Sequence, residues 1–422
     1  MAVFLEPPKD LLKAELTTLE WWKLNSIFNK SIDNRSENEP FVFYDGPPFA
    51  TGLPHYGHLV PNTLKDVVPR YWTMRGFKVE RRFGWDTHGL PIELLVEKKL
   101  GLSGPTEIQE YGVDNFNEVC RNNVLTYTKE WEQIIDRLGR WVDFDNDYKT
   151  MDLSYMESVW WVFAELWKKD LVSQEFKVMP YSCRLSTSLS NFEASLNYLD
   201  VQTPALTIAL VDSDNQNVYL VWTTTPWTLP SNLAIGVNPK LTYVKAKVKN
   251  DDRTFVVAQS CLDRLDKDVE VIEEVLGQEL VGRKYQPLLP YFAEHKNAFQ
   301  LVAASFVKED SGTGLVHLAP DFGEEDFQTC KENNISILNS LDDEGNYRDS
   351  VTDFSGRNYL EAQPELIKML KATGVVFKHE TIQHNYPHCW RSGTPLIYRA
   401  MPAWFVKVSL LKDRMLELNQ QI

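Results

Sequence analysis

The stretch FVFYDGPPFATGLPHYGHLVPNTLKDVVPRY, residues 41–71, decides the expected fold. Its first residues, 41–44, are apolar or aromatic without alternation, which predicts a short buried strand. The Asp-Gly-Pro-Pro run that follows turns the backbone, and apolar residues at helical spacing after His55 predict a helix. Ligands bind beyond the carboxyl ends of strands in an open α/β sheet, and a helix N-terminus attracts phosphate. The stretch therefore predicts a strand–loop–helix unit with a ligand site at its loop.

Two histidines stand at the expected helix start. His55 and His58 are one helical turn apart, and Gly57 leaves room between them. An imidazole can donate a hydrogen bond to a phosphate oxygen, and the chain contains no GxxxxGK[ST] loop that would do so by other means. Two histidines that only cap the helix are the alternative, and the short motif alone favours it.

A second unit of the same kind follows. Residues 77–83 predict a strand, GWDTHGLPIE at residues 84–93 predicts a polar loop, and residues 94–100 predict a helix. Two successive βα units begin a doubly wound parallel sheet, so the expected fold class is α/β. Both loops would meet at one sheet edge, where Asp86 could grip an amino group. A turn aspartate that caps the next helix is the alternative.

Composition narrows the class of protein. A chain of 422 residues predicts two or three domains. The formal net charge of -15 gives no overall attraction to nucleic acid, so any such contact must be local. Five cysteines without a CxxC pair fit a reducing compartment. No membrane span and no leader peptide is recognisable, and we expect a soluble cytoplasmic protein.

The pattern changes beyond residue 180. A helical, aromatic-rich part, in which Trp131, Trp160 and Trp167 are expected to lie in the core, gives way to short β-type runs separated by turn signals. Strands at this spacing predict a barrel-like β domain inserted between the halves of the parallel sheet. The expected strands are residues 206–211, 218–223, 243–248, 254–257 and 301–307.

Two polar stretches lie within this β-rich part. One is WTTTPWTLPSN at residues 222–232, and the other is GTGLVHLAP at residues 312–320, followed by Asp326. Threonine has a high β-propensity, so three in a row can be an ordinary strand end. A buried histidine such as His317 is more often a structural residue than a catalytic one. Each stretch alone therefore favours the structural interpretation.

The motifs together resemble one family. DGPPFATG, HYGH and GWDTHGLPIE, in this order and spacing, are similar to class I aminoacyl-tRNA synthetases of the isoleucyl group, and WTTTPWTLPSN is similar to the same group. The resemblance is taken to be to the cytoplasmic eukaryotic type. The resemblance implies ATP-dependent ligation of isoleucine to tRNA(Ile) with Mg²⁺, and hydrolytic editing of valyl-tRNA(Ile). It implies a Rossmann-like catalytic domain at residues 1–182 and 386–422, interrupted by an editing domain at residues 183–385.

The resemblance also implies site residues. His55, Gly57 and His58 would bind ATP, with both histidines catalytic, while Gly46, Pro47 and Asp86 would bind the amino acid. The editing site, with Asp326 as its catalytic residue on the substrate ammonium, would comprise Thr223, Thr224, Thr225, Thr228, Asn232, His317 and Asp326. An isoleucine pocket rejects valine by only about 1–3 kcal/mol, a limit for which isoleucyl-tRNA synthetase is itself the standard example. A second, smaller pocket therefore has a physical purpose.

Some expected parts of the family are missing. The sequence has no KMSKS-like string and no anticodon-binding region, so we expect the front part of a longer enzyme. Cys183, His388 and Cys389 have no CxxC beside them, and structural zinc is not expected. The alternatives are a free-standing tRNA deacylase or tRNA-binding module, a valyl-type synthetase, and a nicotinamide-dependent oxidoreductase, which the missing GxGxxG disfavours. The resemblance implies tRNA(Ile), isoleucine and ATP as partners. We expect no contact with a membrane, and we expect the protein to be a monomer.

Overall fold

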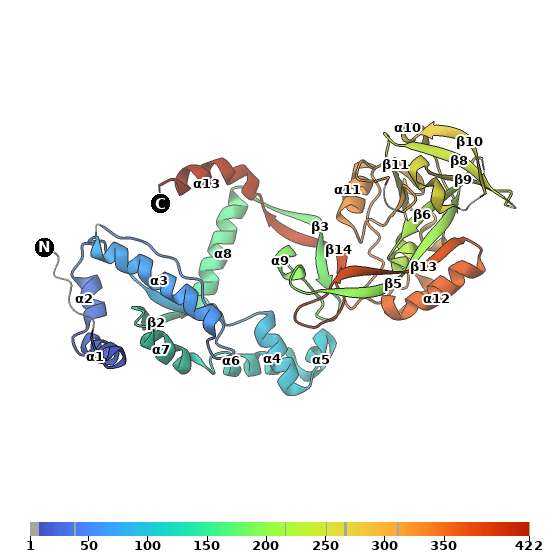
Figure 1. Cartoon of the computed structure of the whole chain (residues 1–422). Helices are drawn as coiled ribbons and strands as arrows, with labels where there is room; N and C mark the ends of the chain where they lie inside the picture. The colour runs from blue at the N-terminus through green and yellow to red at the C-terminus, as the bar shows by residue number, and fades with distance from the viewer. Residues whose placement is uncertain are drawn as a thin grey trace. The chain divides into compact units, whose positions relative to one another are not determined.

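The computed structural model describes residues 8–37, 39–215, 217–249, 251–265, 268–309 and 312–421. The chain divides into two compact units, Met1–Leu171 and Val172–Ile422. Figure 1 labels the helices and strands of both. In the described part of the chain, no helix is long and apolar enough to cross a membrane.

The first unit is built mainly of helices around two parallel strands. Its central pair, β1 (Arg82–Trp85) and β2 (Asp143–Lys149), is joined through four helices, and Trp85 lies opposite Lys149. Parallel strands connected by helices are what the α/β class requires, and this expectation is confirmed. The helices of the unit are α1 (Leu11–Leu24), α2 (Ile27–Asp33), α3 (Tyr56–Met74), α4 (Leu90–Leu100), α5 (Gly104–Tyr111), α6 (Val113–Asn123), α7 (Thr128–Arg137) and α8 (Leu153–Lys168).

The strand expected at residues 41–44 is wrong. No strand is assigned in this described segment: the nearest pairing is the isolated Pro40–Lys78 bridge, where the N–H of Phe41 donates to the carbonyl of Lys78 at 2.8 Å, and Tyr44 is 92% exposed. Phe41 turns inward and stacks on Trp72 with ring centroids 4.7 Å apart. A run of apolar residues forms a buried strand only if other elements cover both faces of the strand. In this segment every second side chain faces solvent.

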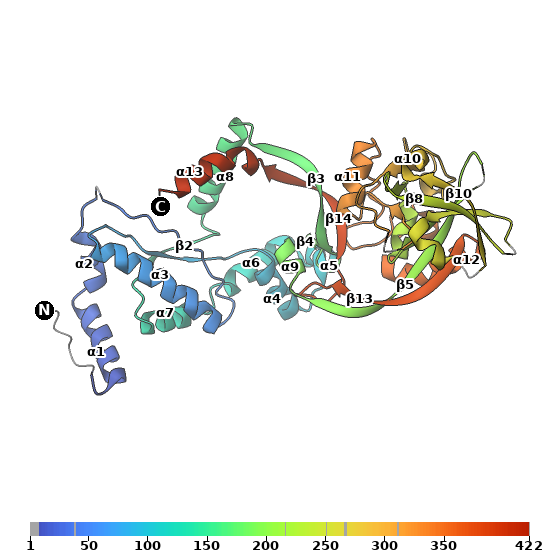
Figure 2. The ribbon, with the colours of Figure 1, turned by 45° about the horizontal axis from the view of Figure 1, so that its top comes forward.

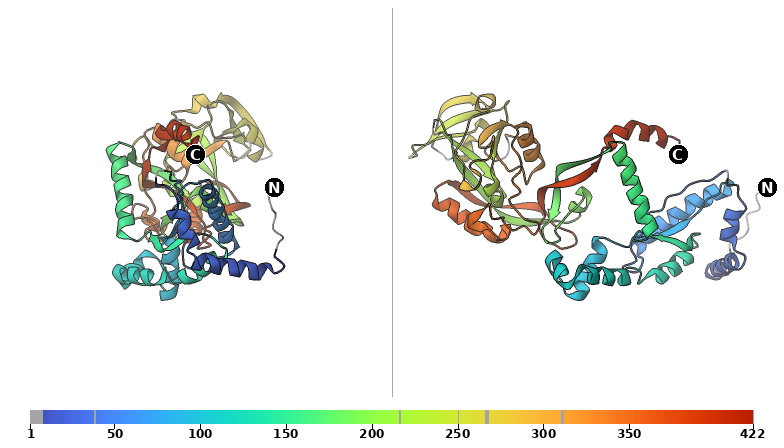
Figure 3. Two further views of the ribbon diagram at one scale, coloured as in Figure 1. Left: turned by 90° about the vertical axis from the view of Figure 1, so that its left-hand side faces the viewer. Right: turned by 180° about the vertical axis from the view of Figure 1, so that it is seen from behind.

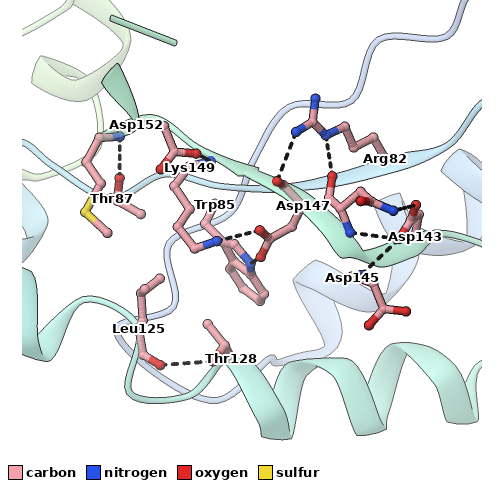
Figure 4. A network of polar contacts seen from close by, with 12 residues as sticks. Arg82, Trp85, Thr87, Leu125, Thr128, Asp143, Asp145, Asp147, Lys149 and Asp152 are labelled. Carbon is pink, nitrogen blue, oxygen red and sulfur yellow. Dashed lines mark hydrogen bonds and ion pairs between the residues drawn. The ribbon is translucent and has the colours of Figure 1, made fainter. Parts of the chain in front are cut away.

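The second expected strand is shifted toward the C-terminus. It includes Gly84, which was expected in a loop, and a Cβ at that position would lie 2.2 Å from the ring of Tyr148. A close approach of this kind admits only glycine in a strand. The strand β2 is tied to β1 by side chains as well: Arg82 donates to the carbonyl of Asp147, and Trp85 Nε1 donates to Asp147 Oδ2 at 2.8 Å (Figure 4).

Of the three tryptophans expected in the core, one is buried and two are exposed. Trp131 is 1% exposed and packs with Phe83 and Trp85 beneath the loops of the first unit. Trp160 and Trp167 on α8 are 70% and 54% exposed, so the expectation is wrong for them. Helical spacing identifies residues on one face but not whether another element covers that face.

The second unit contains a mixed sheet of nine strands. Its order is β10-β8-β9-β6-β12-β7-β11, with β5 joined to β6 and β13 to β5. Two long antiparallel ribbons, β3 with β14 and β5 with β13, extend through the unit (Figures 2 and 3). The strands are β3 (Val172–Ser182), β4 (Thr187–Ser188), β5 (Tyr198–Val211), β6 (Val218–Thr223), β7 (Ala234–Val237), β8 (Thr242–Val248), β9 (Thr254–Ala258), β10 (Val269–Leu276), β11 (Gln300–Ala303), β12 (Leu315–Leu318), β13 (Val376–Pro387) and β14 (Ile397–Val406).

Short helices and 3-10 turns lie between these strands and after the last of them. The longest of these helices, α12 (Tyr359–Ala372), packs against the 3-10 turn η1 (Pro226–Ser231), where the rings of Trp227 and Tyr359 lie 4.7 Å apart. These helices are α9 (Asn191–Ala194), α10 (Gly277–Leu280), α11 (Glu324–Glu332), α12 (Tyr359–Ala372) and α13 (Lys412–Asn419), with 3-10 turns η1 (Pro226–Ser231), η2 (Gln259–Arg264), η3 (Pro290–Phe292), η4 (Thr352–Phe354) and η5 (Val408–Leu411). The mostly-β character expected for this part is confirmed.

Candidate functional sites

The helix start at His55 is a cap built from two imidazoles. His55 Nδ1 accepts a hydrogen bond from the backbone N–H of Gly57 at 3.1 Å, and His58 Nδ1 accepts from the N–H of His55 at 3.2 Å. Because an imidazole nitrogen that accepts carries no proton, the proton of each neutral ring lies on Nε2. The cap thus leaves two Nε2–H donors at the N-terminus of α3.

The environment of His58 keeps it neutral. Burial lowers the pKa of His58 from its ordinary value, and the neighbouring His55 lowers it further. Its ring lies 4.8 Å from that of Trp131, a buried residue. A Cβ on Gly57 would lie 2.8 Å from the His55 ring, so glycine is needed between the two histidines. The structure therefore supports the reason given for HxGH spacing.

The loop with Gly46 and Pro47 is held by two basic side chains, Lys65 and Arg140, which the sequence did not predict as partners. Asp45 forms ion pairs with Lys65 on α3 and with Arg140, whose side chain is 4% exposed. Lys65 Nζ also donates to the carbonyl of Gly46 at 3.0 Å. Tyr148 donates its hydroxyl to the carbonyl of Asp45 at 2.9 Å. No sequence motif predicts these partners of the loop, because they are distant from it in sequence.

Asp86 lies next to that loop. Its backbone N–H donates to the carbonyl of Pro48 at 2.9 Å, and Thr150 Oγ1 lies 3.4 Å from Asp86 Oδ1. The N-cap of α4 is Gly89, so Asp86 does not cap that helix. The structure thus brings the two loops of the first unit together, with one carboxylate oxygen of Asp86 bonded to Thr150. The contact to Thr150 was not expected from the sequence.

The threonine-rich segment and His317 come from neighbouring parallel strands. Val316 on β12 lies opposite Trp222 on β6, so both strands end at the same edge of the sheet. Thr223 ends β6, and Thr224, which is half-buried, follows it. This arrangement explains why two stretches far apart in sequence form one cluster.

Hydrogen bonds join the members of this cluster. Thr225 donates its backbone N–H to Thr223 Oγ1 at 3.1 Å, and Thr228 donates its hydroxyl to the carbonyl of Thr225 at 2.8 Å. The ring of His317 is bound on both sides, with Nε2 3.0 Å from Thr228 Oγ1 and Nδ1 2.8 Å from Asn232 Nδ2. Burial lowers the pKa of His317 to about 4, so the imidazole is neutral at neutral pH.

Asp326 joins the same edge through the backbone. It lies in the first turn of α11, and its Oδ2 accepts the N–H of Ala319 at 2.8 Å. Although Asp326 retains part of its accessible surface, the surrounding protein desolvates the carboxyl and raises its pKa to about 7, with Glu325 adding to the rise. A carboxyl with such a pKa would ionise readily on binding a cation.

Of the two cysteines that follow the ribbon strands β3 and β13, Cys183 is half-buried and Cys389 is buried. Burial raises the pKa of Cys183 to about 12, which keeps it a thiol. Cys389 is buried in an apolar cluster with Leu189 and Leu396. Among the described residues, no group of three or more His, Cys, Asp or Glu is arranged to hold a metal ion.

Comparisons with known proteins agree on one family. Residues 17–422 match the model described as tRNA synthetases class I (I, L, M and V). The chain is 49% identical over 415 residues to the isoleucine–tRNA ligase of Chlamydia pneumoniae, covering 97% of this chain and 40% of that protein. It is 48% identical over 425 residues to that of Bdellovibrio bacteriovorus, covering 99% of this chain and 40% of that protein. The chain thus spans about 40% of the length of these curated relatives. Both are bacterial and lend no support to the expected eukaryotic type.

Similarities to solved structures are weaker. GlLeuRS-CP1 matches with a TM-score of 0.34 and 14% identity, covering 44% of this chain and 99% of that chain. A ternary LeuRS–tRNA–LeuAMS complex of Agrobacterium radiobacter K84 matches with a TM-score of 0.35 and 16% identity, covering 90% of this chain and 50% of that chain. The fold assignment therefore rests on the strand pairing described above.

Proposed function

Because the chain belongs to the class I tRNA synthetases that comprise the I, L, M and V enzymes, we propose that it supplies the first nucleotide-binding half and the editing domain of an isoleucine–tRNA ligase. The identity of 49% to an isoleucine–tRNA ligase over nearly the whole chain supports isoleucine as the substrate. We further propose residues 183–385 as the editing domain, and residues 1–182 with 386–422 as parts of the catalytic domain.

At the first site, the proposed reaction is formation of isoleucyl adenylate. A carboxylate oxygen of isoleucine attacks the α-phosphate of ATP, and pyrophosphate leaves with the electron pair of the broken bond. The Nε2–H groups of His55 and His58 would donate to phosphate oxygens, with Gly57 allowing the close approach. Asp86 would bind the substrate ammonium, and Gly46 and Pro47 would line the pocket for its side chain.

Magnesium would accompany the triphosphate and neutralise part of its charge. The described residues do not form a protein-held metal site, and the roles given to the histidines and Asp86 do not depend on one. The adenylate would pass its acyl group to a ribose hydroxyl of tRNA(Ile), with release of AMP. We propose a cytoplasmic location, in line with the class of reaction.

At the second site, the proposed reaction is hydrolysis of valyl-tRNA(Ile). The one observation that carries this proposal is the hydrogen-bonded cluster of Thr225, Thr228, Asn232 and His317. Asp326, whose pKa is raised, accepts the N–H of Ala319, two residues after His317. Asp326 would bind the substrate ammonium, and His317 would form the wall that excludes isoleucine. Water would attack the ester carbonyl and the ribose hydroxyl would leave, with orientation supplying much of the rate. Thr223 and Thr224 would contact the terminal adenosine.

The test is deacylation by the purified chain. Valyl-tRNA(Ile) and isoleucyl-tRNA(Ile) are offered separately, and release of the amino acid is followed. We expect faster hydrolysis of the valyl ester, and loss of that hydrolysis in Asp326→Ala. Equal rates with both esters, or an Asp326→Ala variant as active as the parent, would contradict the assignment of the second site.

A further inference from the structure

We propose that Tyr285 is a positioning residue which, by holding the side-chain amide of Asn232, sets His317 in its Nε2–H tautomer. The inference rests on the proposed function, since it concerns how the editing cluster is organised. Tyr285 is 1% exposed and belongs to the hydrophobic core. Its hydroxyl donates to Asn232 Oδ1 at 2.7 Å. None of the motifs in the sequence includes it.

The orientation of the Asn232 amide follows from its neighbours. Asn232 Nδ2 lies 3.2 Å from the carbonyl oxygen of Ala234. A carbonyl oxygen only accepts, so it favours the NH₂ group, and the shorter bond from the Tyr285 hydroxyl to the amide oxygen, at 2.7 Å, holds the same orientation. The phenol can donate or accept, but beside an amide oxygen it donates. Burial raises the pKa of Tyr285 well above its usual value, which keeps this donor protonated.

The orientation of the amide then decides the tautomer of His317. One hydrogen of Asn232 Nδ2 is directed to Ala234, and the other is directed to His317 Nδ1 at 2.8 Å. An Nδ1 atom that accepts has no proton, so the proton of the neutral ring is on Nε2. Nε2 is therefore the donor to Thr228 Oγ1 at 3.0 Å.

The relay continues to the threonines. Since the oxygen of Thr228 accepts from His317, its own proton is free to go to the carbonyl of Thr225 at 2.8 Å. The hydroxyl of Thr225 lies 3.3 Å from that of Thr228. A reversed amide at Asn232 would move the histidine proton to Nδ1 and make Thr228 donate to Nε2. The carbonyl of Thr225 would then keep only the backbone N–H of Thr228, at 2.9 Å, and the wall of the proposed pocket would have two states instead of one.

The alternative is that Tyr285 serves packing alone. Its ring lies 5.9 Å from that of Phe299, in the core. Tyr285→Phe keeps the ring and removes only the hydroxyl, so it separates the two roles. Tyr243→Phe is the matched control, because Tyr243 is also buried and donates its hydroxyl to a backbone carbonyl, that of Gly314, at 2.8 Å.

The experiment is ¹⁵N NMR of the His317 side chain in the whole chain at neutral pH, assigned with His317→Gln, together with deacylation of valyl- and isoleucyl-tRNA(Ile). In the parent we expect the Nε2–H pattern. In Tyr285→Phe we expect a mixture of tautomers, valyl-tRNA hydrolysis reduced by about tenfold, and a smaller preference for the valyl ester. In Tyr243→Phe we expect the parental tautomer and preference.

Each result decides the proposal. An Nδ1–H pattern in the parent overturns it without any variant. A folded Tyr285→Phe with unchanged tautomer and unchanged preference also overturns it. If the parent shows the Nε2–H pattern and Tyr285→Phe shifts it, but no ester is hydrolysed, the positioning role stands and the proposed editing function fails.

Discussion

The rings of His55 and His58 stack with centroids 3.8 Å apart, and each ring accepts a backbone hydrogen bond through Nδ1. From the sequence, capping of the helix and binding of phosphate were alternative roles for these two histidines. The geometry makes them compatible, because the cap occupies Nδ1 and places the proton on Nε2. A neutral histidine pair at a helix N-terminus is therefore both a cap and a pair of donors.

The first prediction concerns this pair. His58→Ala should weaken binding of ATP by the chain about tenfold or more, because one donor to phosphate is lost. The lost cap should also cost about 1 kcal/mol of stability. Isothermal titration with ATP and urea unfolding measure the two effects. Asp10→Ala is the control, since Asp10 caps α1 by accepting from the N–H of Lys13 at 3.0 Å. Equal loss of ATP affinity in both variants would refute the donor role.

The second prediction concerns Asp45. Asp45→Ala leaves the buried guanidinium of Arg140 without its carboxylate, which typically costs 3–5 kcal/mol, so we expect about 3 kcal/mol here. Glu15→Ala, which removes an exposed partner of Arg137 in the same unit, should cost less than about 1 kcal/mol. Urea unfolding followed by tryptophan fluorescence compares them. Similar midpoints for the two variants would show that the buried ion pair does not stabilise the loop.

The third prediction concerns Gly84. A Cβ there would lie 2.2 Å from the Tyr148 ring, so Gly84→Ala must displace the ring or the strand. We expect destabilisation by about 1–3 kcal/mol. Gly52→Ala is the control, because nothing lies within 4 Å of a Cβ at that glycine. Thermal unfolding of both variants provides the measurement, and a Gly84→Ala protein as stable as the control would disprove the steric argument.

The fourth prediction concerns the pH dependence contributed by Asp326. Its pKa in the folded chain is about 7 instead of 3.8, so the folded state binds more protons than the unfolded state between these values. The wild type therefore loses stability relative to Asp326→Asn as pH rises from about 4 to about 7, by on the order of 4 kcal/mol at most. Urea unfolding of both proteins at pH 5 and pH 8 measures the change. Glu324→Gln controls for loss of an acidic charge in the same helical turn.

The same titration should govern editing. If ionised Asp326 binds the substrate ammonium, kcat/KM for valyl-tRNA(Ile) should rise with pH through about 7. His317, with a pKa of about 4, does not titrate in that range. A flat profile between pH 6 and pH 8 would argue against Asp326 as the ammonium ligand.

The sequence by itself determined the features that depend on near neighbours. Glycine, proline and helical spacing located the helix that begins after His55, and short β-type runs between turn signals located the strands that became β6, β8 and β9. It also carried the motifs that identify the family. These signals are local, because backbone conformation depends on residues a few positions away.

Only the tertiary structure determined which residues, distant in sequence, contact one another. Asn232 contacts Tyr285 and His317 across separations of 53 and 85 residues, and no spacing rule predicts such contacts. Burial, which set the pKa values of His317 and Asp326, likewise arises only when distant segments pack. The exposure of Tyr44 shows the same limit, because a side chain is buried only where the fold brings something to cover it.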